Sequence, residues 1–320
     1  MTPPESQFFQ DVLVHYTSAQ GLEGILRSNT LWATHASHTN DGEELQTWTK
    51  LLDRFCETRF WEGPWESPAL KNLTGIIENW RKAIEKLKRT LITDDNLQEI
   101  QTYIFSFSEH KKTENHIQKN GRLSQWRAYG DYGIVFNKIE FNKIIYKVPA
   151  FVLDPVLYAN VDESLEKGGK IYNLFYGLVI TYALMENKHI NNALSKKVLQ
   201  LLPLLPEDYD NDESPYFLNV KYYLQIITLI KNIGFEEENE YRLAIFNSNV
   251  ENHPENFTIR RNRLVPYIDI FHHDPLPIEK ILIGPAPAGE QAERKKMVET
   301  LLRHLKKDIP VVCSAIPYRG

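Results

Sequence analysis

The segment His15-Tyr16-Thr17 places an imidazole, a phenol and a hydroxyl directly after an apolar run, residues 12–14, which predicts a buried strand. A histidine at the end of a strand can donate a hydrogen bond to a ribose hydroxyl, while neighbouring backbone groups pair with an amide. The alternative is an imidazole that a carbonyl of the core satisfies. The sequence therefore makes His15 a candidate nucleotide ligand and leaves a structural role open.

A second candidate is the charged segment 236–242, which leads into another apolar run. The two-residue period of a strand predicts Glu238, Glu240 and Arg242 on one face. Two carboxylates and a guanidinium there could orient sugar hydroxyls and stabilise an oxocarbenium ion, as glycosidic bond cleavage requires. A solvated acidic edge is the alternative, and for Glu236 and Glu237 it is the favoured interpretation.

Several common catalytic signatures are absent. The sequence contains no G-x-G-x-x-G fingerprint, no Walker phosphate loop, no G-x-S-x-G elbow and no H-E-x-x-H pair. Two segments hold the candidate metal ligands, which are His35, His38 and Asp41, and His272, His273 and Asp274. Because their spacing fixes no third ligand, surface histidines explain them better, and no metal site is predicted.

One stretch of the chain is locally basic and aromatic. Its cations are Lys111, Lys112, Lys119, Arg122 and Arg127, and its aromatic residues are Trp126, Tyr129 and Tyr132. Cations interleaved with aromatic rings are typical of surfaces that stack bases and bind phosphates. A non-catalytic module that senses nucleotides or nucleic acid is therefore an alternative function.

Periodicity predicts the elements that must position these residues. Strands are expected at 12–16, 31–34, 103–108, 132–136, 144–148, 240–246, 257–260, 278–283 and 311–316. Helices are expected at 19–27, 43–60, 68–91, 123–129, 171–182, 219–230 and 289–305, with a turn at 137–142 and a polar loop at 110–121. This alternation favours a mixed α+β fold over a regular βαβ repeat.

Both ends of the chain contribute to the expected core. We predict a single domain, 1–320, with its core in 10–45, 100–150 and 234–320. Helical insertions are expected at 46–98 and 153–232, where apolar residues recur at helical spacing.

The composition is that of an ordinary globular protein. With 42% hydrophobic and 25% charged residues, it excludes disordered and collagen-like classes, and a net charge of −5 gives no global attraction to nucleic acid. Its two cysteines, Cys56 and Cys313, form no metal or disulfide motif. The N-terminal residues lack signal-peptide features, and the longest apolar stretch, 172–185, is too short to span a bilayer. We therefore expect a cytoplasmic protein without a membrane partner.

The motifs along the chain resemble those of a bacterial domain family of unknown function. That family has H-Y-T, I-L-x-S-x-x-L-W-x-T, N-D-x-x-E, F-S, W-x-x-Y, G-x-x-F and E-x-E-x-R motifs. They correspond here to 15–17, 25–34, 40–44, 107–108, 126–129, 133–136 and 238–242. The resemblance covers most of the chain outside 50–95 and 153–230. The layout of the family is similar to the ADP-ribosyltransferase fold, which implies a split mixed β-sheet around an NAD cleft.

The resemblance implies roles for individual residues. His15 would bind the adenosine-side ribose and Thr17 would support the nicotinamide pocket. Tyr132 or Phe107 would stack on the nicotinamide, Glu240 would bond its ribose, and Glu238 would position the nucleophile. The expected catalytic residues are Glu240 and Glu238, and the expected NAD-binding residues are His15, Tyr16, Thr17, Ser108, Trp126, Tyr132 and Arg242. The S-T-S triplet of the fold is replaced here by Ser106-Phe107-Ser108.

The leading hypothesis is therefore an NAD-dependent ADP-ribosyltransferase or NAD glycohydrolase. NAD would be the substrate, the acceptor would be water, a protein or a nucleic acid, and Arg242, Arg127 and Lys143 are candidates for pyrophosphate contacts. The resemblance also leads us to expect a toxin or an anti-phage defence effector. A metal-dependent phosphohydrolase that uses the histidines and Asp41 remains a further alternative.

Overall fold

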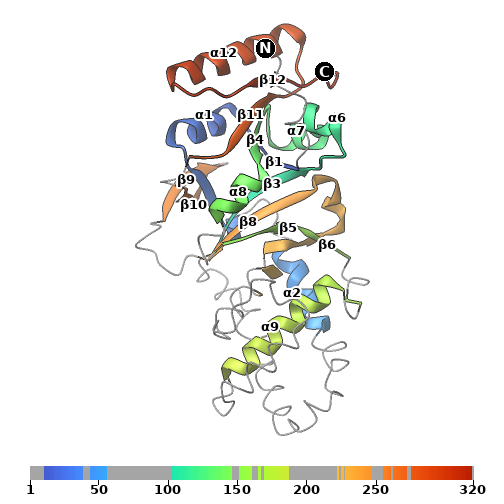
Figure 1. The fold of residues 1–320 in the computed structure, drawn as a ribbon. Coiled ribbons are helices and arrows are strands. Elements are labelled where there is room, and N and C mark those ends of the chain that lie inside the picture. The colour runs from blue at the N-terminus through green and yellow to red at the C-terminus, as the bar shows by residue number, and fades with distance from the viewer. Residues whose placement is uncertain are drawn as a thin grey trace. The chain divides into compact units, whose positions relative to one another are not determined.

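The computed structural model describes residues 11–38, 44–55, 102–145, 151–160, 165–166, 169–186, 222, 225–226, 228–246, 255–260, 262–271 and 275–318. The chain divides into two compact units. Unit 1 comprises Met1–His35, Tyr103–Pro155 and Phe235–Gly320, and unit 2 comprises Ala36–Thr102 and Val156–Gly234. In Figure 1 unit 1 combines blue, green and red ribbons, from the beginning, middle and end of the chain. The predicted single domain with two helical insertions stays a prediction.

Unit 1 is built on a large mixed sheet, as expected for an α+β protein. Its main strand order is β12-β11-β4-β1-β3-β2-β10-β9, and β8 pairs with β3 and β5. The bounds are β1 Val12–Thr17, β2 Leu31–His35, β3 Thr102–His110, β4 Tyr132–Asn137, β5 Phe151–Pro155, β8 Glu240–Phe246, β9 Asn256–Arg260, β10 Arg263–Ile270, β11 Ile278–Ile283 and β12 Val311–Cys313. The pair β11–β12 is parallel, whereas β1 pairs antiparallel with both β3 and β4.

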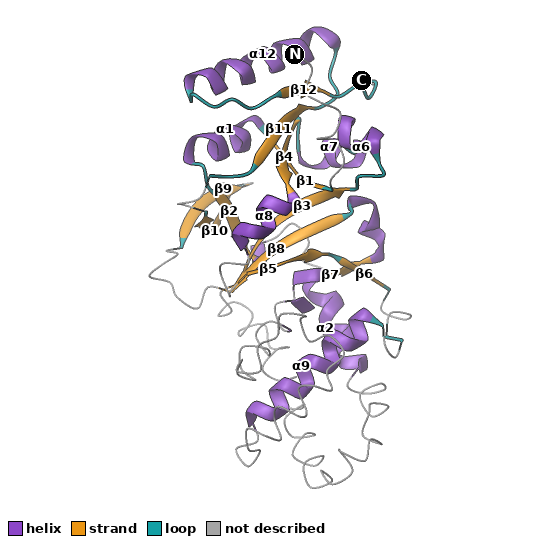
Figure 2. Cartoon of the chain, viewed as in Figure 1, coloured by secondary structure: helices purple, strands orange, loops and turns teal. Residues whose placement is uncertain are grey.

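Short helices connect and flank these strands (Figure 2). They are α1 Ala19–Ser28, α6 Asn115–Asn120, α7 Leu123–Tyr129, α8 Lys138–Ile145 and α12 Ala288–His304, with the 3-10 helix η6 at Ile233–Glu238. The unit 2 elements are the 3-10 helix η2 Ala36–His38, α2 Glu44–Arg54, α9 Lys170–Glu186, and the parallel strands β6 Leu157–Ala159 and β7 Ile230–Asn232. No helix within the described ranges is long and apolar enough to cross a membrane.

Alternating side chains of β1 divide between two apolar clusters. Leu13 belongs to a large cluster with Phe107 and Phe136, whereas Val14 belongs to a smaller one with Trp126. Because successive side chains of a strand point to opposite faces, the sheet of unit 1 is covered by apolar packing on both faces here. A strand buried on both faces positions its end residues rigidly.

Local chemistry fixes the helix that follows β1. The Ser18 side chain caps α1 by accepting a hydrogen bond from the Gly21 backbone N–H at 3.2 Å. Leu22, Ile25 and Leu26 recur at helical spacing and are buried. Asn29 ends the helix in the left-handed conformation, at φ 57°.

The prediction of a turn at 137–142 and a strand at 144–148 was wrong where the structure describes it. Helix α8 occupies Lys138–Ile145, and residues 146–150 lie outside the described residues. The Asn137 side chain accepts from the Glu140 N–H at 2.9 Å, as a helix cap does. Phe141 and Ile145, four residues apart, are both buried. The apolar residues 144 and 145, which predict a strand by their type, therefore belong to the end of a helix.

The predicted polar loop 110–121 also contains regular structure. Strand β3 continues to His110, and α6 spans Asn115–Asn120. Strands β5 and β10 were not predicted, whereas the predicted helix 68–91 lies outside the described residues. Half of the predicted helix 219–230 is likewise outside them; its described residues 222, 225–226 and 228–229 are helical, and its last residue, Ile230, begins β7.

Candidate functional site

Strand β3 pairs with three other strands of unit 1. Residues 108–110 pair with β1, residues 103 and 104 pair with β2, and β8 also pairs with β3. Between the first two stretches, the Ser106 carbonyl accepts a hydrogen bond from His15 Nδ1 at 3.0 Å. The His15 side chain thus bonds a backbone acceptor where the regular β1–β3 pairing has ended.

The environment of His15 determines its charge and which of its ring nitrogens can accept a hydrogen bond. Burial lowers the pKa of His15 to about 4, so the ring is neutral at pH 7. Because a carbonyl only accepts, Nδ1 carries the proton and Nε2 is left as an acceptor. The ring packs on Phe105 at 4.3 Å and edge-on to Phe107 at 6.5 Å. A sugar hydroxyl could therefore donate to Nε2, which reverses the direction of the hydrogen bond expected from the sequence.

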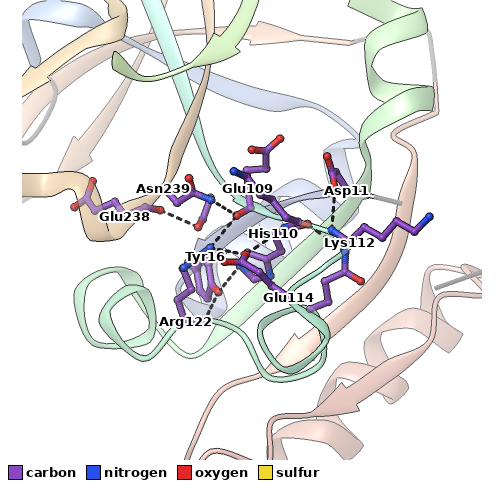
Figure 3. A network of polar contacts seen from close by, with 12 residues as sticks. Asp11, Tyr16, Glu109, His110, Lys112, Glu114, Arg122, Glu238 and Asn239 are labelled. Atoms are coloured by element: carbon purple, nitrogen blue, oxygen red, sulfur yellow. Dashed lines mark hydrogen bonds and ion pairs between the residues drawn. The ribbon is translucent and has the colours of Figure 1, made fainter. Parts of the chain in front are cut away.

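Tyr16, the next residue, makes its contacts inside the protein. Its hydroxyl accepts from the Arg122 backbone N–H at 2.7 Å and lies 3.1 Å from His110 Nε2 (Figure 3). Its ring lies edge-on to Trp126 at 4.6 Å. Burial raises the pKa of Tyr16, so the phenol stays protonated and donates to His110. Tyr16 joins β1, β3 and the start of α7.

The other predicted stacking residues differ in accessibility. Trp126 is only 6% exposed and donates from Nε1 to the Asn120 carbonyl at 2.9 Å. Phe107 is 2% exposed and packs between Phe136 and Phe141. Tyr132 is partly exposed and pairs across the sheet with Thr17. Of the aromatic residues expected to stack on a ligand, Tyr132 and Tyr129, which is 38% exposed, therefore have accessible rings.

Glu238 does not lie on a strand, which corrects the prediction of one face shared by 238, 240 and 242. It is the last residue of η6, and Asn239, at φ 43°, turns the chain before β8 begins at Glu240. Asparagine adopts the left-handed conformation more readily than most residues, so Asn239 itself was the available sequence signal for this turn. Alternation consequently starts two residues later than predicted, and only Glu240 and Arg242 share a face of β8.

Glu238 is anchored to β3 through its backbone. The Ser108 hydroxyl donates to the Glu238 carbonyl at 2.9 Å, and the Glu109 N–H donates to the Asn239 carbonyl at 2.9 Å. Asn239 Nδ2 returns a hydrogen bond to the Glu109 carbonyl at 2.7 Å, as Figure 3 shows. The Glu238 carboxylate remains partly exposed and accepts from the Tyr129 hydroxyl at 3.0 Å. Tyr129 had been predicted only as a stacking residue.

Glu240 and Arg242 form a buried ion pair. The Arg242 fork donates to the two carboxylate oxygens at 2.7 and 2.9 Å, and the side chains are 8% and 3% exposed. Their neighbours Tyr241 and Leu243 pack in the same apolar cluster as Phe107. Alternation therefore directs Glu240 and Arg242 to the face opposite that cluster, whereas His15 packs on the cluster itself. Hydrogen bonds hold His15 and Glu238 to β3. The Arg242 guanidinium is paired with Glu240.

A polar network continues from Tyr16 along the end of β3 (Figure 3). Arg122 donates to the Glu114 carboxylate at 2.9 Å and to the Glu109 carbonyl at 3.3 Å. Lys138 pairs with the Glu109 carboxylate. Burial lowers the pKa of His110 to about 3, so this ring is neutral too. Arg122 is therefore bonded within this network, and Trp126 is buried. Both observations weaken the case for an open basic and aromatic surface.

The metal candidates find no support in the described residues. No group of three or more His, Cys, Asp and Glu side chains could hold a metal ion within those ranges. His35 is buried and lies edge-on to Tyr103 at 5.2 Å. Asp41 and residues 272–274 lie outside the described residues.

Comparison with family models, with curated proteins and with solved structures finds no match to this chain. The resemblance to a bacterial domain family and to the ADP-ribosyltransferase fold therefore stays a prediction.

Proposed function

We propose that the chain cleaves the N-glycosidic bond of NAD, as an ADP-ribosyltransferase or an NAD glycohydrolase. The observation that supports this most is that both candidate residues, His15 and Glu238, are hydrogen-bonded to β3. The Ser106 carbonyl is bonded by His15, and the Ser108 hydroxyl is bonded to Glu238. Ser106 and Ser108 are two residues apart, roughly 7 Å along the strand, so both candidate residues are held on the same short stretch of β3.

The end of the β1–β3 ladder also favours this class. The pairing of β1 with β3 includes Val14 and Ser108, and the pairing of β2 with β3 includes Ile104. A sheet that divides along one strand in this way is what the resemblance to the ADP-ribosyltransferase fold implies. In the proposal, the nucleotide lies beside His15 and its hydroxyl donates to Nε2.

Glu238 carries the chemistry in this proposal. The bond between the ribose and nicotinamide breaks, its electron pair goes to the nicotinamide nitrogen, and neutral nicotinamide leaves. The carboxylate stabilises the positive charge that develops on the ribose, while Tyr129 fixes its orientation. Water or an acceptor group then adds to the same carbon and gives up its proton. Glu240, neutralised by Arg242, stabilises less of that charge and holds the start of β8 instead.

The alternatives have less support in the described residues. A stacking module of Trp126, Tyr129 and Tyr132 loses its largest ring, because Trp126 is 6% exposed, whereas Tyr129 is 38% exposed. A metal-dependent phosphohydrolase would need a ligand cluster, and none occurs in the ranges that the structure covers.

Nicotinamide release tests the proposal. Purified protein and NAD, with and without cell extract, should yield nicotinamide, and Glu238→Gln should lower kcat roughly 100-fold. Glu237→Gln is the matched control, because Glu237 is the exposed neighbour in η6 and should leave kcat unchanged. The absence of nicotinamide in every mixture with the folded wild-type protein would refute the proposal. Glu240→Gln is a poorer test, because it breaks a buried ion pair and destabilises the fold.

A further inference from the structure

The hairpin of β9 and β10 ends the main sheet of unit 1 and carries exposed apolar side chains. The strand order stops at β9, and no strand of the described ranges pairs with its outer edge. Phe257, Ile259 and Leu264 are 59, 73 and 66% exposed. They share one face of the sheet, because Ile259 lies directly opposite Leu264 and two residues from Phe257. An exposed edge strand with an apolar face is a template for pairing with another strand.

The turn of this hairpin determines which backbone groups of β9 bond β10. Two residues connect Arg260 to its partner on β10, and the second, Asn262, has the positive φ, 62°, that such turns favour. The residues that flank a two-residue loop exchange both hydrogen bonds, and bonded pairs then alternate with non-bonded pairs along the strands. The N–H and C=O groups of Phe257 and Ile259 therefore face the free edge of β9. Pro266 agrees with this assignment, because it lies opposite Phe257 and has no N–H to donate to β9.

Charge is divided between the two ends of β9. Arg260 is its last residue and lies directly opposite Arg263. At the other end, Asn256 Nδ2 donates to the Asp269 carboxylate at 3.3 Å, and Glu255 precedes the strand. A second copy of β9 that runs antiparallel would place the basic end of each strand beside the acidic end of the other. A parallel copy would instead place like charges side by side, which destabilises a strand pair.

We propose that β9 pairs antiparallel with β9 of a second copy of this chain, about a two-fold axis at Thr258. In this register Phe257 of each chain lies opposite Ile259 of the other, so all four outward backbone groups of each strand bond the second copy. A register centred on Phe257 or on Ile259 would pair one of these residues with a position outside β9. The interface is isologous, as in most soluble dimers.

The same register agrees with the distribution of charge. Arg260 of each chain lies opposite Asn256 of the other, on the face that holds the Asp269 carboxylate. The two Arg260 residues are four positions apart along the strands, roughly 14 Å. Because a single strand pair is a small interface, we expect a dissociation constant of about 1–100 μM.

Sedimentation equilibrium of the full chain tests the dimer. The mass of the wild type should rise from 37.4 kDa toward twice that value as its concentration is raised from about 1 to 300 μM. Ile259→Lys should weaken dimerisation about 10-fold or more, because it replaces an apolar contact that occurs twice in the symmetric interface. Leu264→Lys is the matched control and should dimerise like the wild type, because Leu264 is an exposed residue of the same face but lies on β10, away from the free edge.

A cysteine on the two-fold axis tests the register. Thr258 would lie opposite Thr258 of the second copy as a non-hydrogen-bonded pair, with Cα atoms about 4.5 Å apart, which a disulfide can bridge. Thr258→Cys should therefore form a disulfide-linked dimer under mild oxidation. Leu264→Cys and the wild type, which has Cys56 and Cys313, should not.

Three results would overturn the proposal. The first is a wild-type mass of 37.4 kDa at every concentration. The second is a dimer that folded Ile259→Lys leaves unchanged, or that Ile259→Lys and Leu264→Lys weaken equally, since the free edge would then not be the interface. The third is the absence of a disulfide-linked Thr258→Cys dimer. A thermal melt shows that each variant is folded, and none of these measurements involves NAD, so the outcome is independent of the proposed function.

Discussion

Burial decides the charge of two histidines on neighbouring strands of unit 1. His15 and His110 are both neutral at pH 7, because the pKa of the first is lowered to about 4 and that of the second to about 3. Each ring bonds a neutral oxygen, a carbonyl for His15 and a phenol for His110. Neither contact would compensate a buried positive charge. At the residue scale, His15 and His110 therefore act as neutral hydrogen-bonding groups.

These pKa values predict that the protein loses stability in mild acid. Below pH 6.5 the unfolded chain takes up protons on its histidines, while folded His110 stays neutral down to about pH 3. The free energy of unfolding should therefore fall as the pH is lowered from 7.5 to 5.0, with His110 contributing about 2 kcal/mol. Urea titrations at the two pH values would measure it. His110→Gln should lose about 2 kcal/mol less than the wild type over this range.

The control for this effect is His304→Gln, which removes an exposed histidine of α12. It should keep the wild-type pH dependence. Equal pH dependence in His110→Gln and the wild type would contradict the assignment of a buried neutral His110.

At the element scale, the turn between α7 and β4 packs closely against the end of β1. Gly130 has φ 132°, a conformation that residues with a Cβ rarely adopt. A Cβ at this position would lie 2.5 Å from the Thr17 carbonyl oxygen, which is backbone and cannot rotate away. This glycine lets the chain pass against the end of β1, next to the segment that carries His15.

Gly130→Ala should therefore destabilise the protein. We expect a loss of roughly 1–3 kcal/mol in the free energy of unfolding, from backbone strain and the steric clash together. Gly24→Ala is the matched control, because it lies in α1 with open space around the added methyl group. The control should be neutral or stabilising by up to about 1 kcal/mol. Urea denaturation of both variants would test this, and equal stabilities would contradict the close packing at Thr17.

The sequence was informative about elements with strong periodicity and uninformative about contacts between distant residues. The apolar runs of β1, β4 and β11 and the helical stripe of α1 predicted those elements, because burial imposes their spacing. The short helix α8 was missed, because few residues distinguish its spacing from that of a strand. The bond from His15 to Ser106 joins residues 91 positions apart, and no local pattern specifies it. The same holds for the pairing of Tyr129 with Glu238, 109 positions apart.

At the scale of the whole molecule, both ends of the chain supply the candidate site. His15 comes from the N-terminal segment, Ser106 and Ser108 from the central one, and Glu238 from the C-terminal one. All of these segments belong to unit 1. A site assembled in this way depends on the complete sheet of unit 1, and separate fragments of the chain should not bind NAD.

A crystal structure of the protein with NAD tests the central claim most directly. The proposal predicts a ribose hydroxyl within hydrogen-bond distance of His15 Nε2 and the nicotinamide ribose beside Glu238. Glu238→Gln protein, which should bind NAD without cleaving it, is the form to use. Well-ordered NAD bound away from β3, or no bound NAD at saturating concentration, would contradict the proposal.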